Sequence, residues 1–266
     1  MTDRSDFQLT VLGPRGSVPV SGPQFETFGG ATSCYLVQAG EETVFLDAGS
    51  GLLQAPSDFP HDPFILLSHL HLDHVLGLGM YPRLTMRGKG TRICVPAGEG
   101  KDAKTVLDRL YSPPFWPLSL ADCAGDVAIA ALEMPMQIGE LRVESVEGCH
   151  PGGCRAFRLS YRGRSLVYAT DFEHEEEAFC RLADFAAGTD LLLYDGQFTE
   201  ADYALRKGFG HSTAEKGLEL KERCGAKQLL LIHHAPSADD AALFSREAAI
   251  GRTDVHFARA GETIKL

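Results

Sequence analysis

The stretch Ser68-His69-Leu70-His71-Leu72-Asp73-His74 brings three imidazoles and one carboxylate close together in the sequence. It directly follows the apolar run Phe64-Ile65-Leu66-Leu67, which comes after the turn-forming pair Asp62-Pro63 and therefore predicts a buried strand. Neutral imidazole and carboxylate are common protein ligands of zinc, manganese and iron. A H-x-H-x-D-H run behind a buried strand therefore predicts a metal site rather than a surface loop with unrelated histidines.

Further histidines and aspartates come shortly after predicted strands. His150, Asp171 and His233 each stand where an alternating or apolar segment ends. Side chains in such positions can converge on one edge of a sheet, and together with the first cluster they are too numerous for one tetrahedral ion. Two metal ions fit the set. The candidate ligands are His69, His71, Asp73, His74, His150, Asp171 and His233.

Two other segments are predicted to lie near this site. The strand expected at 43–46 ends in Asp47-Ala48-Gly49-Ser50-Gly51, where the glycines allow a close backbone approach. Asp47 is predicted to fix a ligand imidazole by a hydrogen bond, with a simple turn as the alternative. The loop at 13–30, rich in glycine and proline, either borders the active site or is a plain surface connection.

The bulk composition is that of a soluble α/β domain, and we expect one domain over residues 1–266. A formal net charge of −11 without a Lys/Arg-rich run argues against binding to long nucleic acids, but allows a small anionic substrate held by metals. The sequence has neither a signal-peptide pattern at its start nor a membrane-spanning apolar run, so we expect a cytoplasmic protein without a membrane partner. The seven cysteines, including Cys149 and Cys154, are expected to be reduced. A homodimer is compatible with the sequence.

The order of these motifs resembles the metallo-β-lactamase superfamily over nearly the whole chain, from Asp47-Ala48-Gly49-Ser50-Gly51 to His233. The resemblance implies an α/β fold, a four-layer αββα sandwich with a dinuclear site at one edge. It also implies two ligand groups joined by a bridging aspartate. The first metal would be held by His69, His71 and His150, the second by Asp73, His74 and His233, and Asp171 would bridge them.

Such a site predicts a metal-dependent hydrolase. Two close divalent cations lower the pKa of a shared water from about 16 to near 7, so metal-bound hydroxide is the expected nucleophile. Asp73 is predicted to be catalytic as well as a ligand, because it would orient this nucleophile or accept its proton. Zinc is the first expectation for both ions, with manganese or iron as alternatives.

The segment Gly210-His211-Ser212-Thr213-Ala214 resembles the histidine motif of ribonuclease Z-like phosphodiesterases. This implies that His211 is catalytic, contacting the scissile phosphate and assisting the leaving group. The residues Ser212-Thr213-Ala214-Glu215 have the form of a capping box, which predicts a helix that starts at Ser212. A histidine beside a helix N-terminus is well placed for phosphate oxygens. The alternative is that His211 merely extends the cap.

The spacing of the ligands bears on the substrate. Ribonuclease Z enzymes that process transfer RNA carry a long arm between the ligands equivalent to His150 and Asp171, whereas only 20 residues separate these positions here. The segment Gly29-Gly30-Ala31-Thr32-Ser33-Cys34 also resembles the GGNTSC element of small hydrolases, with Ala31 in place of Asn. We therefore expect a dinuclear phosphodiesterase acting on a small-molecule or cyclic phosphodiester. A lactonase or thioesterase of the same fold and a non-catalytic metal-binding accessory protein are the alternatives.

Several other residues could be mistaken for site residues. His234 is expected to point away from the ligands, and His61 and His174 are expected on the surface. Phe115 and Trp116 stand on a proline-rich loop, where they either line a pocket or pack as a satellite core.

Overall fold

The protein is described here by a computed structural model, which covers residues 6–98 and 101–266. The strands of the first sheet are β1 (Phe7–Gly13), β2 (Cys34–Ala39), β3 (Glu42–Leu46), β4 (Phe64–Leu66), β5 (Gly90–Val95), β6 (Asp126–Ala131) and β14 (Thr263–Lys265). Those of the second are β7 (Met136–Ile138), β8 (Leu141–Glu147), β9 (Arg155–Tyr161), β10 (Arg164–Ala169), β11 (Leu191–Asp195), β12 (Gln228–Ile232) and β13 (Val255–Phe257). The α-helices are α1 (Leu72–Val75), α2 (Ala103–Asp108), α3 (Glu176–Phe185), α4 (Glu200–Arg206), α5 (Ala214–Cys224) and α6 (Asp240–Ile250).

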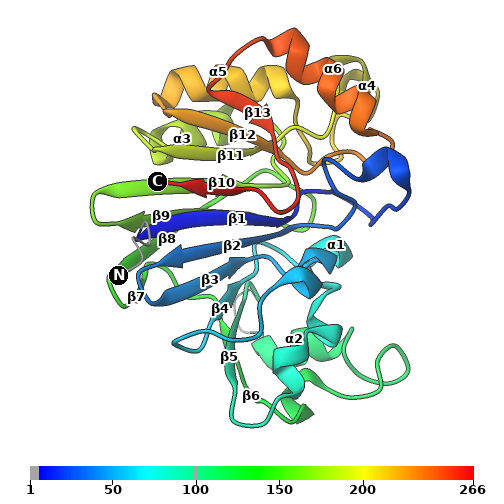
Figure 1. Ribbon diagram of the computed structural model, residues 1–266, viewed down its shortest axis with the longest axis vertical. Helices are drawn as coiled ribbons and strands as arrows, with labels where there is room; N and C mark the ends of the chain where they lie inside the picture. Colours follow the sequence, from blue (N-terminus) through cyan, green and yellow to red (C-terminus); the bar gives the residue numbers. More distant parts are fainter. Residues whose placement is uncertain (1–5, 99–100) are drawn as a thin grey trace.

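Both sheets are mixed, and their strand orders are β14-β1-β2-β3-β4-β5-β6 and β13-β12-β11-β10-β9-β8-β7. Strands β3 to β6 pair in parallel in the first sheet, and β10 to β13 do so in the second. Helices α3, α5 and α6 gather around β11 to β13, whereas α1 and α2 lie on the opposite side of the molecule near β3 to β6 (Figure 1). This arrangement confirms the expected αββα sandwich.

Three apolar clusters hold the layers together. The central one joins the facing sides of the two sheets and includes Val37, Leu159 and Leu193, each with an exposed fraction of 0%. A second packs α3, α5 and α6 onto the outer face of the second sheet, and a third packs the helical segments after β4 and β5 onto the first sheet. Because β10, β11 and β12 are covered on both faces, they are almost uniformly apolar, as parallel central strands are.

The parallel strands place the candidate site residues at one edge. Asp47 follows β3, Asp171 comes just after β10 and His233 follows β12, and these three residues have positive φ angles of 61°, 49° and 60°. A non-glycine residue in this region is strained by roughly 1–3 kcal/mol, and such strain gathers at functional sites. The strained turns redirect the chain as soon as each strand ends, which leaves these side chains at the rim of the sandwich.

One predicted helix boundary is wrong. Helix α5 begins at Ala214 with Thr213 as its N-cap, since Thr213 Oγ1 accepts a hydrogen bond from the amide of Lys216. The Ser212 hydroxyl cannot cap the helix, because it is hydrogen-bonded to Tyr194 Oη at 2.9 Å and to His174 Nδ1 at 2.8 Å. Within the described part of the chain, no helix combines the length and the apolar content that a membrane span requires.

Candidate metal centre

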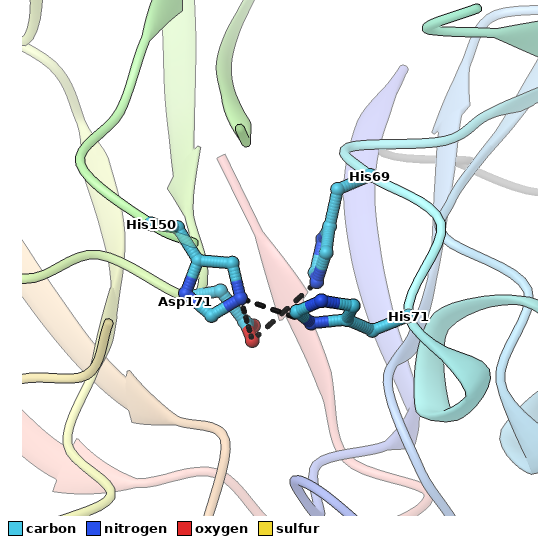
Figure 2. Close-up of side chains that lie close together, drawn as sticks. All are labelled: His69, His71, His150 and Asp171. Atoms are coloured by element: carbon cyan, nitrogen blue, oxygen red, sulfur yellow. Dashed lines mark hydrogen bonds and ion pairs between the residues drawn. The ribbon is translucent and has the colours of Figure 1, made fainter. Parts of the chain in front are cut away.

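The first predicted ligand group is assembled from both sheets. His69 and His71 follow β4, whereas His150 follows β8 and Asp171 follows β10, and their side chains point toward one another (Figure 2). One ligand atom from each of the four residues lies within 4.8 Å of those of the others. His150 Nε2 is 3.0 Å from His71 Nδ1 and 3.6 Å from Asp171 Oδ2. Two imidazole nitrogens this close need a proton or a cation between them.

The second predicted group lies directly beside the first. Asp73 and His74 come from α1, and they meet Asp171 and His233 with ligand atoms again within 4.8 Å of one another. His233 Nε2 lies 3.1 Å from both Asp73 Oδ2 and Asp171 Oδ1, and His74 Nε2 lies 3.1 Å from Asp171 Oδ1. Because Asp171 turns Oδ2 to the first group and Oδ1 to the second, its carboxylate stands where a bridging ligand belongs.

The polar atoms of these groups fit metal ions. Among the described residues, the Nε2 atoms of His69 and His74 are buried and have no hydrogen-bond partner. Buried polar groups of native proteins almost always have a partner, so an orphaned imidazole nitrogen needs an explanation. Both atoms face the shared carboxylate of Asp171, at 3.6 and 3.1 Å. A divalent cation in each ligand group, bound by these lone pairs, would satisfy both nitrogens.

The electrostatics of the second group also favour a cation. Burial lowers the pKa of His74, but the carboxylates of Asp171, Asp47 and Asp73 outweigh burial and raise this pKa well above its usual value. His233 behaves in the same way, with its pKa raised to about 9 mainly by Asp171 and Asp73 against the effect of burial. The buried carboxylates therefore stabilise positive charge between them, and a bound divalent cation would supply this charge in place of the protons on the imidazoles.

Asp47 holds His74 as predicted. Its fully buried carboxylate lies 2.7 Å from His74 Nδ1 through Oδ2, and it also accepts hydrogen bonds from the Ser68 amide at 2.6 Å and the Tyr168 hydroxyl at 2.7 Å. With Nδ1–H donated to this carboxylate, the lone pair of His74 Nε2 faces the other ligands. These contacts show that Asp47 holds the imidazole of His74, which is one of the predicted ligands.

The loop before β2 closes over the second group. The Ser17 amide donates a hydrogen bond to Asp73 Oδ2 at 2.7 Å. A Cβ atom on Gly16 would lie only 2.3 Å from His233 Nδ1, so only glycine lets the backbone approach this ring. Of the two roles considered for the loop at 13–30, the border of the site is therefore the one that the structure shows.

His211 lies at the same centre and is paired with a residue that the sequence did not single out. Its Nδ1 is 2.9 Å from Asp195 Oδ2, and its ring stacks on His233 with centroids 5.0 Å apart and planes at 20°. Asp195, His211, Asp171 and His233 form a further cluster with atoms within 4.8 Å of one another. Asp195 is the last residue of β11, so the same strand-end signal that selected the other residues could have selected it.

The remaining residues fall outside the ligand groups. His234 points away, as predicted, with Nε2 2.7 Å from the carbonyl oxygen of Ala258. His61 is 52% exposed at its side chain, but His174 is half-buried against Tyr203 with a ring distance of 4.2 Å, so the prediction that His174 is a surface residue is wrong.

The aromatic residues of the proline-rich loop and the two cysteines near His150 also lie outside the ligand groups. Trp116 packs on the outer core of the first sheet, whereas Phe115 is 73% exposed. Cys149 and Cys154 are free thiols beside the first ligand group.

Known proteins resemble this chain in sequence and fold. A family model described as a beta-lactamase superfamily domain matches residues 42–234. Ribonuclease Z of Ignicoccus hospitalis is 27% identical over 73% of this chain and 79% of that protein. The "Probable metallo-hydrolase YhfI" of Bacillus subtilis is 24% identical over 85% of this chain and 86% of its own length.

Solved structures share the whole fold. The crystal structure of Bacillus subtilis YhfI has a TM-score of 0.73 at 22% identity, covering 97% of this chain and 98% of YhfI. A diphosphatase from the PhnP family has a TM-score of 0.70 at 18% identity, covering 97% of this chain and 96% of that chain. The family match, the two mixed seven-stranded sheets and the His/Asp clusters together show that this chain belongs to the metallo-β-lactamase superfamily, as a metallo-hydrolase in the branch of ribonuclease Z and YhfI.

Proposed function

We propose that this protein is a dinuclear metal-dependent phosphodiesterase that acts on a small-molecule or cyclic phosphodiester. The observation that carries the proposal is the pair of His211 and Asp195 beside the second ligand group, with a nitrogen–oxygen distance of 2.9 Å. In such a pair the carboxylate orients the imidazole next to the metal ligands, where it can donate a proton to an alkoxide oxygen that leaves phosphorus.

The ligand groups define which residues would hold the cofactors. His69, His71 and His150 would hold one divalent cation, Asp73, His74 and His233 would hold the other, and Asp171 would contribute to both. When bound, the cations supply positive charge that polarises a phosphoryl oxygen and acidifies a water molecule. Zinc, manganese and iron all suit this set of imidazole and carboxylate donors, and zinc is the ion we propose first.

Asp73 would orient the attacking water. Burial raises the pKa of Asp73, but His74 and His233 outweigh burial and hold this pKa well below its usual value, so the carboxylate is ionised. Its Oδ2 is fixed by the Ser17 amide at 2.7 Å and by His233 Nε2 at 3.1 Å. An ionised carboxylate held in this way accepts a hydrogen bond from water and so orients it for attack on phosphorus.

His211 would act on the leaving group. Asp195 is fully buried and accepts the Nδ1–H of His211, which leaves Nε2 available to a bound substrate. Asp195 Oδ1 is itself held by the Gln197 amide at 2.9 Å, so the carboxylate fixes the orientation of the His211 ring. His211 can therefore hydrogen-bond a phosphoryl oxygen and deliver a proton to the departing oxygen.

The surroundings favour a small substrate. The chain between His150 and Asp171 forms only the β9–β10 hairpin, without room for an arm that would grip a large RNA. A cavity of about 490 Å³ adjoins His69, with Gly152 and Arg155 in its lining, and its size suits the organic group of a small diester. Two similar proteins are named a ribonuclease and a diphosphatase, and both names denote hydrolysis at phosphorus.

Hydrolysis of bis(p-nitrophenyl) phosphate by the zinc- or manganese-loaded protein tests the proposal. His211→Ala should lower kcat by about 10²- to 10⁴-fold, the range for loss of a general acid, while the metal content stays that of the wild type. His61→Ala is the matched control, because His61 is an exposed histidine paired with Glu41 and Glu42. A metal-loaded protein that leaves phosphodiesters intact but opens lactones or thioesters would contradict the proposal.

A further inference from the structure

A buried glutamate outside the ligand set holds the loop that precedes His211. The Glu173 residue is 7% exposed, and both of its carboxylate oxygens accept backbone hydrogen bonds. Oε1 accepts from the Gly208 amide at 2.7 Å, and Oε2 accepts from the Gly210 amide at 3.0 Å. The Tyr203 hydroxyl donates the third hydrogen bond to this carboxylate, also to Oε1, at 3.2 Å.

Few other contacts fix this loop. Gly208 and Gly210 have positive φ angles of 91° and 89°, so the backbone follows a path that regular structure does not stabilise. Phe209, between them, is 63% exposed and anchors the loop only weakly through its side chain. The carboxylate of Glu173 is thus the main buried group that collects the two amides.

The same loop supports a metal ligand. The carbonyl oxygen of Gly210 lies 2.9 Å from His150 Nδ1, which makes it the acceptor that leaves His150 Nε2 free to face the first ligand group. A Cβ atom on Gly210 would lie 2.0 Å from His150 Nδ1, so the loop and the ring are in tight contact. On the other side of His150, the Glu173 amide donates to the carbonyl oxygen of Cys149 at 2.8 Å.

We propose that Glu173 is a positioning residue that fixes two groups at once: His150 through the Gly210 carbonyl, and His211 through the loop immediately before it. The part that concerns His211 rests on the proposed function, whereas the part that concerns His150 rests on the ligand geometry alone. The hydrogen bonds of the Glu173 side chain go to Tyr203, Gly208 and Gly210 and to no member of the ligand groups, so its carboxylate acts through the loop that it holds.

A carboxylate is required because both partners are N–H donors. In Glu173→Gln one oxygen becomes an NH₂ group, which faces an amide N–H and repels it, so one end of the loop is released. In Glu173→Asp the charge is kept, but the shorter side chain cannot reach both amides. Both variants should therefore loosen the Gly210 carbonyl from His150 even though only one of them changes the charge.

The test compares Glu173→Gln and Glu173→Asp with the matched control Asp190→Asn. Asp190 is also a largely buried carboxylate, and it accepts a hydrogen bond from the Ser165 amide at 2.8 Å. It lies at the opposite end of β11 from the site. Zinc affinity is measured by competition with a chromophoric chelator. The values of kcat and KM are measured with bis(p-nitrophenyl) phosphate. Thermal unfolding of the metal-free proteins reports whether each variant is folded.

Both Glu173 variants should bind zinc about 10- to 100-fold more weakly, which is the range for loss of a group that holds a metal ligand in place. Their kcat should fall by a similar factor, whereas KM should change less than about 3-fold. Asp190→Asn should lose thermal stability only. Zinc affinity and kcat that match those of Asp190→Asn would overturn the inference. If the wild-type protein does not hydrolyse the diester, the proposed function falls, but the zinc competition still decides the role of Glu173.

Discussion

Replacing Asp47 by Asn changes one fully buried oxygen from a hydrogen-bond acceptor to a donor. Asp47 Oδ2 faces His74 Nδ1, the Ser68 hydroxyl and the Tyr168 hydroxyl, each at 2.7 Å. The two hydroxyls can rotate and accept a hydrogen bond from the new NH₂ group. The imidazole can accept only if its proton moves to Nε2, so the substitution acts mainly on His74.

The tautomer change determines the magnitude. A proton on His74 Nε2 occupies the lone pair that would bind the second metal, beside Asp171 and Asp73 at 3.1 and 3.3 Å. We expect the affinity for the second ion to fall about 10- to 100-fold, the range for loss of an outer-shell partner. This corresponds to about 1.4–2.7 kcal/mol of binding free energy. The first ligand group should lose less affinity, because Asp47 reaches it only indirectly, through the Ser68 hydroxyl that lies 3.0 Å from His69 Nδ1.

The assay is a titration of the metal-free protein with zinc, in which the two binding steps are resolved by calorimetry. Tyr168→Phe is the matched control, since it removes one donor to the same oxygen and leaves the tautomer of His74 unchanged. Asp47→Asn should weaken binding of the second ion more than binding of the first, and Tyr168→Phe should weaken neither. Two unchanged binding steps in Asp47→Asn would refute the argument that Asp47 orients a metal ligand.

Three further predictions concern the whole molecule. Removal of both metal ions by a chelator should abolish hydrolysis and lower the free energy of unfolding by about 2.7 kcal/mol for each ion, relative to zinc at 100 times its Kd. Added zinc should restore both the activity and the thermal stability. Leu159→Ala should cost about 2–5 kcal/mol in urea unfolding, because Leu159 is fully buried between the sheets, but should leave kcat of the folded enzyme unchanged. Hydrogen bonds from Arg252 and Lys221 hold the pKa of Asp254 in the folded protein well below its usual value. These hydrogen bonds therefore stabilise the folded protein fully at pH values above the unfolded pKa of about 3.9. The stabilisation is lost as the pH falls through the lower pKa of the folded state. Asp254→Asn should therefore be less stable than the wild type at pH 7 and should converge with it in strong acid.

Some elements left little trace in the sequence. Strand β6 is a mostly exposed edge strand in which only Val127 and Ile129 are partly buried, and its alanines have low β propensity, so its segment carries a weaker strand pattern than the buried strands. All residues of α4 are at least partly exposed, which removes the apolar periodicity that marks other helices. Such elements are fixed by their place against neighbouring strands and loops.

The site shows the same division. His69, His71, Asp73 and His74 were predictable because a buried strand followed by a turn fixes their positions locally. His150, Asp171 and His233 followed from the same rule, since each comes after its own strand, and the resemblance to a known family then ordered them into two groups. The tertiary structure brings these seven residues together as the sequence predicted.

The sequence by itself thus determined the strand-end residues, because strand, turn and ligand lie within a few positions of one another. Apart from Asp47, which the sequence already singled out as a partner of a ligand imidazole, only the tertiary structure decided which groups orient them. His211 meets Asp195 across 16 residues, Ser17 meets Asp73 across 56, and His150 meets Gly210 across 60. These pairs form where two sheets and their loops converge, and no local spacing encodes that convergence.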